Sequence, residues 1–404
     1  MAAPRYYEIR LFDRPLVAFT LTDEALSLEI TLDDYDNTAY HLMPCGLSLD
    51  AEGLWRWLES RSIPANRRNA ARICHQLGFQ LGNLEALYKT SLGLSLNDSY
   101  WVVPKSFPGR FADYNLFDNS FSEAIGALAV SGEVRGSSLA GNTPELTTDG
   151  TLRKGWRIVD GKRVLYKGAS DGYAPGEPTS EYLAWLIARS LGLDAVRYGL
   201  DTWANEQCST CENFASKDVS YVPFAVATGS TNLADVLRWC HALSSECFQS
   251  VCDMLVFDAL ICNTDRHLAN FGILRDNVTG KPLKLAPLFD NGRGLFPNVA
   301  EDDHQQFMLE AHLHGPAFGG ATFEELLQRI MGPRQLSLLQ RAQARGIVGN
   351  VHAPAKRVAA LDAFIRQQSA DLQSIPTVDH EALVAALATS APQRAPFEQG
   401  PFRL

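Results

Sequence analysis

The sequence lacks any long apolar run, and this limits where the protein can act. Residues 1–30 mix charged and apolar side chains, so no signal peptide is evident. No segment approaches the roughly 18 consecutive apolar residues that a membrane-spanning helix needs. We therefore expect a cytoplasmic protein without a membrane partner, and secretion as an effector without a signal peptide remains open.

Positive charge is also scarce. The chain has 36 lysine and arginine residues against 46 aspartate and glutamate residues, which gives a net charge of −10. This balance argues against a protein held on nucleic acid by a general basic field, so direct nucleic-acid binding is not expected. A local basic run at residues 66–72 is typical of the solvated face of a helix.

The eight cysteines are scattered and include a single CxxC pair, Cys208 and Cys211. No second CxxC pair or nearby histidine completes a zinc site, so a metal or redox role for this pair is disfavoured. Other cysteines, such as Cys74 and Cys252, lie in apolar, helix-like settings. This pattern favours buried reduced thiols over a disulfide framework.

At 404 residues the chain exceeds one ordinary hydrophobic core, so two or three packed units are expected. Residues 6–45 show the period-2, β-branched pattern of strands, and helix-like spacing follows between residues 49 and 90. Nothing in this part has the look of a catalytic site. We predict an accessory α+β domain (1–105), a β-rich unit (106–218), a mostly helical unit (219–390) and a tail (391–404).

The segment Asn-Thr-Asp-Arg-His-Leu-Ala-Asn, residues 263–270, is the motif around which the rest of the sequence can be interpreted. It follows an apolar, helix-like run and precedes a β-prone segment, so Asp265 and Asn270 share one loop. Asp290 follows a second β-prone segment after the turn at 276–280, and the pattern predicts a hairpin. Because a hairpin brings its ends together, we expect Asn270 and Asp290 to face one pocket.

These three side chains suit phosphoryl transfer. Asp265 would orient and deprotonate an acceptor hydroxyl, while Asn270 and Asp290 would hold Mg²⁺ against the phosphates. Turns also favour Asp, Asn and Gly, so each residue taken alone is equally compatible with ordinary turn formation.

Three upstream features have both a functional and an ordinary interpretation. The Gly-, Ser- and Thr-rich segment 136–150 could wrap phosphates or could be a surface loop, and it matches neither a P-loop nor GxGxxG. Lys167 ends a hairpin built around Asp160-Gly161, where a strand lysine could face water or bind a nucleotide. Glu181, placed in the first turn of a helix that Gly192 closes, could be a helix-start acid or the partner of that lysine. Their order along the chain supports the functional interpretation of each.

Four segments resemble the HipA-like serine/threonine kinases, which are distant relatives of protein kinases. Residues 263–271 resemble the family's Asn-x-Asp-x-His-x-x-Asn-Phe catalytic loop, and residues 285–290 are similar to the segment that carries its metal-binding acid. Residues 138–141 resemble the Ser-x-Ala-Gly of its phosphate-binding loop, and residues 165–167 resemble the strand with its nucleotide-binding lysine. The resemblance points to a stand-alone or secreted-effector-like branch of the family.

The resemblance implies a protein-kinase-like bilobal fold of the HipA type, with residues 106–218 as a β-rich N-lobe and residues 219–390 as a helical C-lobe. It further implies ATP and Mg²⁺ as cofactors, a protein substrate with a Ser or Thr acceptor, and autophosphorylation of the phosphate loop. Catalytic roles then fall to Asp265, Lys167, Asn270 and Asp290, with Asn270 and Asp290 as metal ligands. The implied nucleotide-binding residues are Ser137, Ser138, Gly141, Asn142, Thr143, Lys167, Glu181, Glu212, Phe214 and His267.

The chain also departs from the family pattern. It has Thr143-Pro144-Glu145 where those kinases tend to have Gln-x-Lys. Residues 1–105 do not resemble the short N-terminal subdomain of the HipA toxin, so a target such as a tRNA synthetase is not implied. An antitoxin-like partner remains open.

Two other functions stay in view. The same residues could phosphorylate a small molecule or lipid, or the fold could be a non-catalytic partner-binding scaffold. The presence of Asp265, Asn270 and Asp290 together favours an enzyme, because a scaffold has no chemical need of the three.

Overall fold

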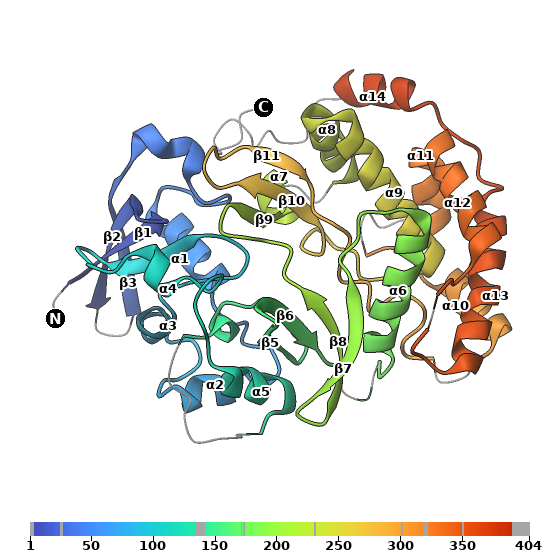
Figure 1. Cartoon of the computed structure of the whole chain (residues 1–404). Helices are drawn as coiled ribbons and strands as arrows, with labels where there is room; N and C mark the ends of the chain where they lie inside the picture. Colours follow the sequence, from blue (N-terminus) through green and yellow to red (C-terminus); the bar gives the residue numbers. More distant parts are fainter. Residues whose placement is uncertain are drawn as a thin grey trace.

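The computed structural model describes residues 4–24, 27–133, 142–170, 172, 174–229, 232–299, 302–317, 322–349 and 351–389. Figure 1 shows sheets on one side of the molecule and a group of helices on the other. Three antiparallel sheets are formed, with strand orders β3-β2-β1-β4, β5-β6-β8-β7 and β11-β10-β9. In the part of the chain that is described, no helix is both long and apolar enough to span a bilayer.

The N-terminal sheet forms because alternate residues along its strands are apolar and turn to one face. Tyr7, Ile9 and Leu11 are buried on that face of β1 and pack with the helices that follow. Within residues 49–90, where helix-like spacing was noted, one helix begins only at Ala70, because Asn69 before it has a left-handed backbone (φ 64°). The elements are β1 (Arg5–Leu11), β2 (Arg14–Glu24), β3 (Ser27–Tyr35), the 3-10 helix η1 (Asn37–Leu42), α1 (Ala51–Ser60), α2 (Ala70–Gln76), α3 (Leu84–Ser91) and β4 (Tyr100–Pro104).

The second sheet contains the predicted hairpin around Asp160 and Gly161, both of which have positive φ, as its tight turn requires. The CxxC pair, Cys208 and Cys211, lies on a strand, β8. Three positions apart on a strand, their side chains point to opposite faces. The elements are α4 (Phe111–Tyr114), α5 (Glu123–Ser131), η2 (Pro144–Leu146), β5 (Lys154–Val159), β6 (Lys162–Lys167), α6 (Glu177–Leu191), β7 (Tyr198–Trp203) and β8 (Glu206–Glu212).

The remaining residues form a small sheet and a largely helical body, as the apolar spacing predicts. Residues 224–228 form a short helix, α7, directly after β9. Helix α9 is buried along almost its whole length and is the centre of the largest apolar cluster. The elements are β9 (Val219–Pro223), α7 (Phe224–Thr228), α8 (Leu233–Leu243), α9 (Ser245–Ile261), β10 (Gly272–Asp276), β11 (Pro282–Leu285), α10 (His304–Leu313), α11 (Phe323–Ile330), α12 (Pro333–Arg345), α13 (Ala355–Leu372) and α14 (His380–Thr389).

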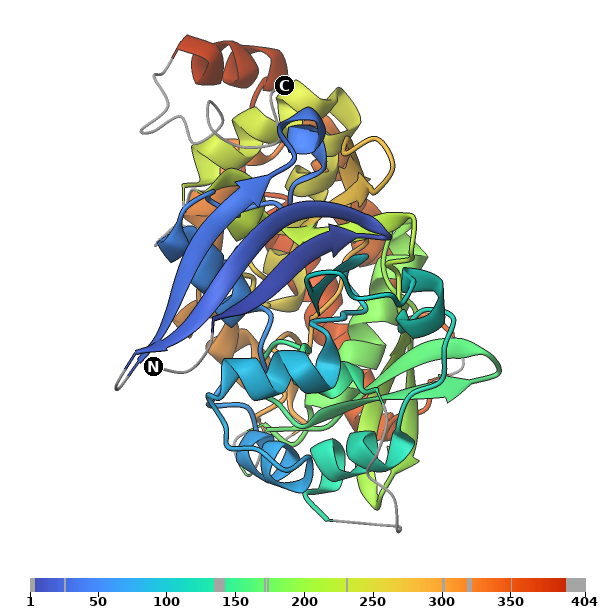
Figure 2. The ribbon, with the colours of Figure 1, turned by 90° about the vertical axis from the view of Figure 1, so that its left-hand side faces the viewer.

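The N-terminal sheet is joined to the rest of the molecule next to β9. Figure 2 shows β1, β2 and β3 crossing the face of the molecule that is turned toward the viewer. The Ser99 hydroxyl donates to the Lys217 carbonyl at 2.7 Å, and the Tyr221 amide donates to the Asn97 carbonyl at 2.8 Å. The stretch before β4 therefore lies directly against the connector between β8 and β9.

Candidate functional site

The loop after α9 is held in place by its own polar side chains. Helix α9 ends where Cys262 adopts a left-handed backbone (φ 51°). The Asn263 side chain then donates to Asp258 inside α9 at 3.0 Å and accepts the amide of Asp265 at 3.2 Å. Asn270 donates from its side chain to the Asp265 carbonyl at 2.8 Å. The loop thus has a defined shape without any use of the Asp265 carboxylate.

Arg266 ties this loop to its surroundings. Its guanidinium is buried and pairs with the buried Asp258 of α9 at 3.0 Å. It also donates to the carbonyls of Asn270 at 2.6 Å and Phe289 at 2.7 Å. One side chain therefore couples α9, the loop and the segment before Asp290. Asp258 was missed in the sequence because it lies within an apolar run and gives no local signal.

The predicted hairpin is confirmed, and it brings Asn270 and Asp290 to one cavity. Strands β10 and β11 pair from Ile273 opposite Leu285. Asn270 and Asp290 both contribute to the wall of a cavity of about 200 Å³. Asp290 has a left-handed backbone (φ 57°), a conformation that costs energy for a residue other than glycine and is concentrated at functional sites.

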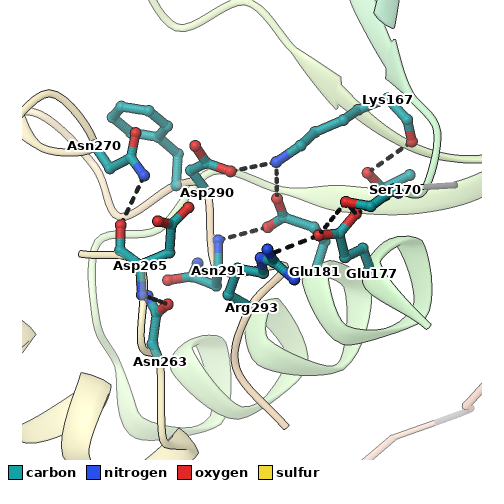
Figure 3. Close-up of polar contacts among 12 residues, drawn as sticks. Lys167, Ser170, Glu177, Glu181, Asn263, Asp265, Asn270, Asp290, Asn291 and Arg293 are labelled. Carbon is teal, nitrogen blue, oxygen red and sulfur yellow. Dashed lines mark hydrogen bonds and ion pairs between the residues drawn. The ribbon is translucent and has the colours of Figure 1, made fainter. Parts of the chain in front are cut away.

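Lys167 lies between two acids in this cavity (Figure 3). Its Nζ donates to Glu181 at 2.9 Å and also contacts a carboxylate oxygen of Asp290. Burial opposes ionisation of all three groups, yet the two carboxylates raise the pKa of Lys167. Although burial favours the neutral acid, Lys167 holds the pKa of Asp290 well below its usual range. Lys167 and Asp290 therefore stay charged, whereas burial raises the pKa of Glu181.

The prediction that Glu181 lies in the first turn of its helix was wrong. Helix α6 begins at Glu177, with Pro178 in its first turn, so Glu181 lies in the second turn. It is completely buried, and its other oxygen accepts the Asn291 amide at 2.8 Å. Glu177, one turn earlier, accepts from the Ser170 amide at 2.7 Å instead.

The cavity wall includes the predicted connector and several residues that sequence reasoning missed. Glu212 and Phe214 contribute to it, although the Glu212 carboxylate also pairs with exposed Lys162 at 2.7 Å. Phe214 packs against Phe289 and Tyr221. The stretch 95–97 also lines the cavity, although nothing in the sequence of residues 1–105 has the look of a catalytic site.

Lys154 is the most informative residue that was missed. It lies on β5 directly opposite Lys167 on β6 and lines the same cavity. Among the described residues no carboxylate forms an ion pair with it. Burial, together with the charge of Lys167, lowers its pKa to about 8. The signal was available, because residues paired across an antiparallel hairpin point to the same face.

Only some of the residues predicted to form the phosphate-binding loop are described by the structure. Ser137, Ser138 and Gly141 lie outside the described residues. The Asn142 carbonyl accepts the Ser122 amide at 3.0 Å, and Thr143 is buried before η2. Neither lines the cavity, so their phosphate contacts remain a prediction. His267 is exposed, and its ring nitrogen accepts the Ala269 amide at 3.3 Å.

Glu145, which stands where the related kinases tend to have lysine, has a structural role here. Its side chain is 1% exposed, and it pairs with the fully buried Arg67 at 2.6 Å. It also accepts the amide of Trp156 on β5 at 2.8 Å. This carboxylate is therefore held by Arg67 and a backbone amide, and Glu145 does not line the cavity.

The Asp265 carboxylate faces a second space next to the first. This cavity of about 230 Å³ is lined by Asp265, Thr264, Arg293 and Phe296, among others. No described residue hydrogen-bonds to the carboxylate oxygens of Asp265. Burial and the negative charge of Asp290 raise its pKa. An acceptor group entering this space would meet an unoccupied basic oxygen beside the first cavity.

Comparison with known proteins shows similarity to one family model and to two proteins, CtkA and HipA. A family model, the HipA-like C-terminal domain, matches residues 137–358. The serine/threonine-protein kinase CtkA of Helicobacter pylori strain J99 is 34% identical over 139 residues, covering 30% of this chain. The match spans only 41% of the length of CtkA. The crystal structure of CtkA gives a TM-score of 0.46 at 21% identity, covering 60% of this chain and 94% of that one.

The similarity to HipA concerns the fold of nearly the whole chain. A chain of the HipA–HipB toxin–antitoxin complex with operator DNA from Shewanella oneidensis MR-1 superposes with a TM-score of 0.53. It is 15% identical and covers 95% of both chains. This coverage reaches into residues 1–105, although their sequence does not resemble the short N-terminal subdomain of the HipA toxin. The predicted α+β, kinase-like fold of the HipA type is confirmed, and this chain belongs to the HipA-like C-terminal domain family.

Proposed function

We propose that this protein is a Mg²⁺- and ATP-dependent kinase that transfers the γ-phosphoryl group to a serine or threonine hydroxyl. One observation carries the proposal: Lys167, Asn270 and Asp290 line one cavity, and Asp265 faces the space beside it. These are the positioning and charge-stabilising groups that phosphoryl transfer requires. The partial likeness to CtkA supports the same reaction class.

Each side chain has a separate task in this proposal. Lys167, fixed by Glu181 at 2.9 Å, would bind the α- and β-phosphates. Lys154 would supply the second positive charge that the phosphate loop lacks at Glu145. Asp265 would accept the hydrogen bond of the acceptor hydroxyl and align it for in-line attack.

The residues present fit a magnesium ion. Mg²⁺ prefers oxygen ligands and is usually held by one or two protein groups together with phosphates and water. Asn270 and Asp290 offer such oxygens at the cavity wall. When bound, the ion would neutralise charge on the phosphates. Lys167, which now contacts Asp290, would then be free to turn toward the nucleotide.

The acceptor proposed is a protein serine or threonine. Ser137 or Ser138 would be the acceptor in autophosphorylation, and an antitoxin-like partner would control access to the site. A small-molecule or lipid acceptor, or a scaffold without activity, remains the competing proposal.

The experiment is incubation of the purified protein with Mg²⁺ and labelled ATP, followed by intact-mass analysis and peptide mapping. We expect the parent to gain phosphate and Asp265→Ala to gain none. Asp290→Ala should bind nucleotide weakly, with little response to Mg²⁺. If the parent binds ATP equally with and without Mg²⁺, the metal role assigned to Asn270 and Asp290 fails. If it binds no ATP, the scaffold proposal replaces the kinase.

A further inference from the structure

A second large cavity lies away from Asp265 and Asn270. It has a volume of about 810 Å³, which is in the range of sites for small organic ligands. Its walls come from one face of α6, the first residues of β7 and the link between α12 and α13. No aspartate or glutamate is among the described residues that line it, in a protein of net charge −10. The cavity is therefore cationic against the overall charge of the chain.

The positive charge comes from arginines that an aromatic ring holds in place. The guanidinium groups of Arg189 and Arg197 lie 5.6 and 6.0 Å from the centre of the Trp185 ring. Neither forms an ion pair with a described carboxylate. A guanidinium stacked on a ring keeps its N–H edge available, and that edge matches a phosphate or carboxylate. Arg345 of α12 lines the same cavity and donates to the Ser190 carbonyl.

The rest of the wall fits a ring-shaped organic body. Tyr182 lies 6.0 Å from Trp185 and 6.5 Å from His352, measured between ring centres. Leu186 and Leu200 add apolar surface. An inorganic anion would fill only a small part of this volume, whereas an anion carrying a planar ring would contact both kinds of wall.

The cavity is also connected to the candidate catalytic site through two short links. Tyr198 lines both cavities, and its hydroxyl accepts the Asp290 amide at 3.2 Å. Glu181, the partner of Lys167, immediately precedes Tyr182 on α6. A ligand held between α6, β7 and the α12–α13 link would therefore contact Tyr198 and the residue next to Glu181. Tyr198 positions Asp290, and Glu181 positions Lys167.

We propose that this cavity is a regulatory site for a small organic anion of the size of a nucleoside monophosphate. Arg189 and Arg197 bind its phosphate, and the ring-lined wall holds its base. Occupancy changes the nucleotide affinity of the catalytic cavity by biasing α6 and Tyr198. This inference goes beyond the proposed kinase activity, and binding to the cavity can be measured without any phosphoryl transfer.

The test uses adenosine and guanosine monophosphate as probes, with inorganic phosphate and the two nucleosides as comparisons. Binding is followed by calorimetry on the full chain after the catalytic cavity has been saturated with a non-hydrolysable ATP analogue and Mg²⁺. We expect a monophosphate to bind under these conditions and the variant Arg189→Gln/Arg197→Gln to bind it at least about tenfold more weakly. The matched control Arg56→Gln changes an exposed arginine on α1 and should bind like the parent.

Three results would overturn the proposal. Displacement of the monophosphate by the ATP analogue would place its binding in the catalytic cavity. Binding by the double variant that equals the parent's would exclude the two arginines from the site. Inorganic phosphate binding as tightly as the monophosphates would exclude a role for the ring-lined wall. For the regulatory step, we expect saturating monophosphate to shift the analogue's Kd by about fivefold or more, and reciprocally. An unchanged Kd would reject that step.

Discussion

At the residue scale, Asp265 combines an exact backbone position with an uncommitted side chain. Its amide and carbonyl are fixed by Asn263 and Asn270, while its carboxylate accepts no hydrogen bond from a described residue. Asp265→Ala should therefore leave the free energy of unfolding within about 0.5 kcal/mol of the parent, since no buried partner is left unsatisfied. Phosphoryl transfer should fall by about 10²–10⁴-fold.

Urea unfolding and single-turnover transfer measure the two quantities separately. Asp258→Ala is the contrasting variant, because it removes the buried partner of Arg266 and should lose about 3–5 kcal/mol of stability. A large loss of stability in Asp265→Ala would show that its carboxylate serves the fold.

Lys154 gives a pH-dependent prediction. Its pKa is lowered to about 8, so the ammonium loses its proton as the pH rises through that value. A bound triphosphate favours the charged form, and nucleotide affinity should therefore decrease above about pH 8. Lys154→Met should weaken binding at neutral pH by about tenfold, the loss of one charge-assisted hydrogen bond, and flatten the pH dependence.

Fluorescence titration with a nucleotide analogue between pH 6.5 and 9.5 measures this effect (roughly 1.5 units on either side of the pKa). Lys162→Met, on the exposed face of the same hairpin, is the matched control. An equal pH dependence in Lys154→Met and in the parent would exclude Lys154 as the titrating group.

The sequence was sufficient to predict which side chains lie together where local order decides it. Asp265 and Asn270 share one loop, and a hairpin brings Asn270 and Asp290 to one cavity, while their chemical roles stay predictions. Glu145 could not be interpreted in this way, because its partner Arg67 lies 78 positions away. Only the packing of distant segments decides that this acid faces an arginine and not a phosphate.

At the scale of elements, the hairpin of β10 and β11 determines where Asn270 and Asp290 lie. Strand β10 also pairs with β9, and Gly272 lies opposite Pro223. A Cβ at Gly272 would lie 2.1 Å from the Val222 carbonyl oxygen, a contact that the backbone can relieve only by moving. Gly272→Ala should cost about 1–3 kcal/mol of stability and weaken Mg²⁺-dependent nucleotide binding, because Asn270 precedes this strand by two residues.

Gly168→Ala is the control, because the nearest atom to its Cβ would be 3.6 Å away. Denaturant unfolding and nucleotide titration of both variants give the comparison. Equal stability of the two variants would mean that the β9–β10 pairing tolerates the shift and does not constrain the loop.

Whether a segment forms a helix or a strand was predictable where its apolar periodicity was strong. The residues at which helices and strands begin and end were not predictable. Helix α9 and the two hairpins have clear patterns in the sequence. The start of α6 was placed one turn late, which put Glu181 in the wrong turn, because Pro178 and Glu177 also suit a loop. Strand β8 was missed because its polar residues pair with β6 and β7, and that pairing is not visible in the local sequence.

At the scale of the whole molecule, the N-terminal part is structurally continuous with the cavity that Lys167 and Asp290 line. The buried guanidinium of Arg275 on β10 donates to the His41 carbonyl and the Tyr100 hydroxyl, each at 2.6 Å. Asn213 of the connector donates to the Leu96 carbonyl at 3.0 Å. These contacts join segments more than a hundred residues apart, so sequence patterns alone assigned the N-terminal residues to a separate accessory domain.

Nucleotide binding should therefore protect the N-terminal sheet as well as the catalytic cavity. A ligand at a hundred times its Kd stabilises the folded state by about 2.7 kcal/mol, and this slows exchange of amides that open only on global unfolding by about a hundredfold. We expect this slowing in β4 when a non-hydrolysable ATP analogue and Mg²⁺ are added, measured by hydrogen–deuterium exchange with mass spectrometry. Ser99→Ala removes a contact to the connector without touching the cavity lining, so at equal saturation it should reduce the protection of β4. Protection confined to residues 154–290 would instead show that the N-terminal sheet opens independently of the cavity. Nucleotide binding would then not stabilise the N-terminal sheet.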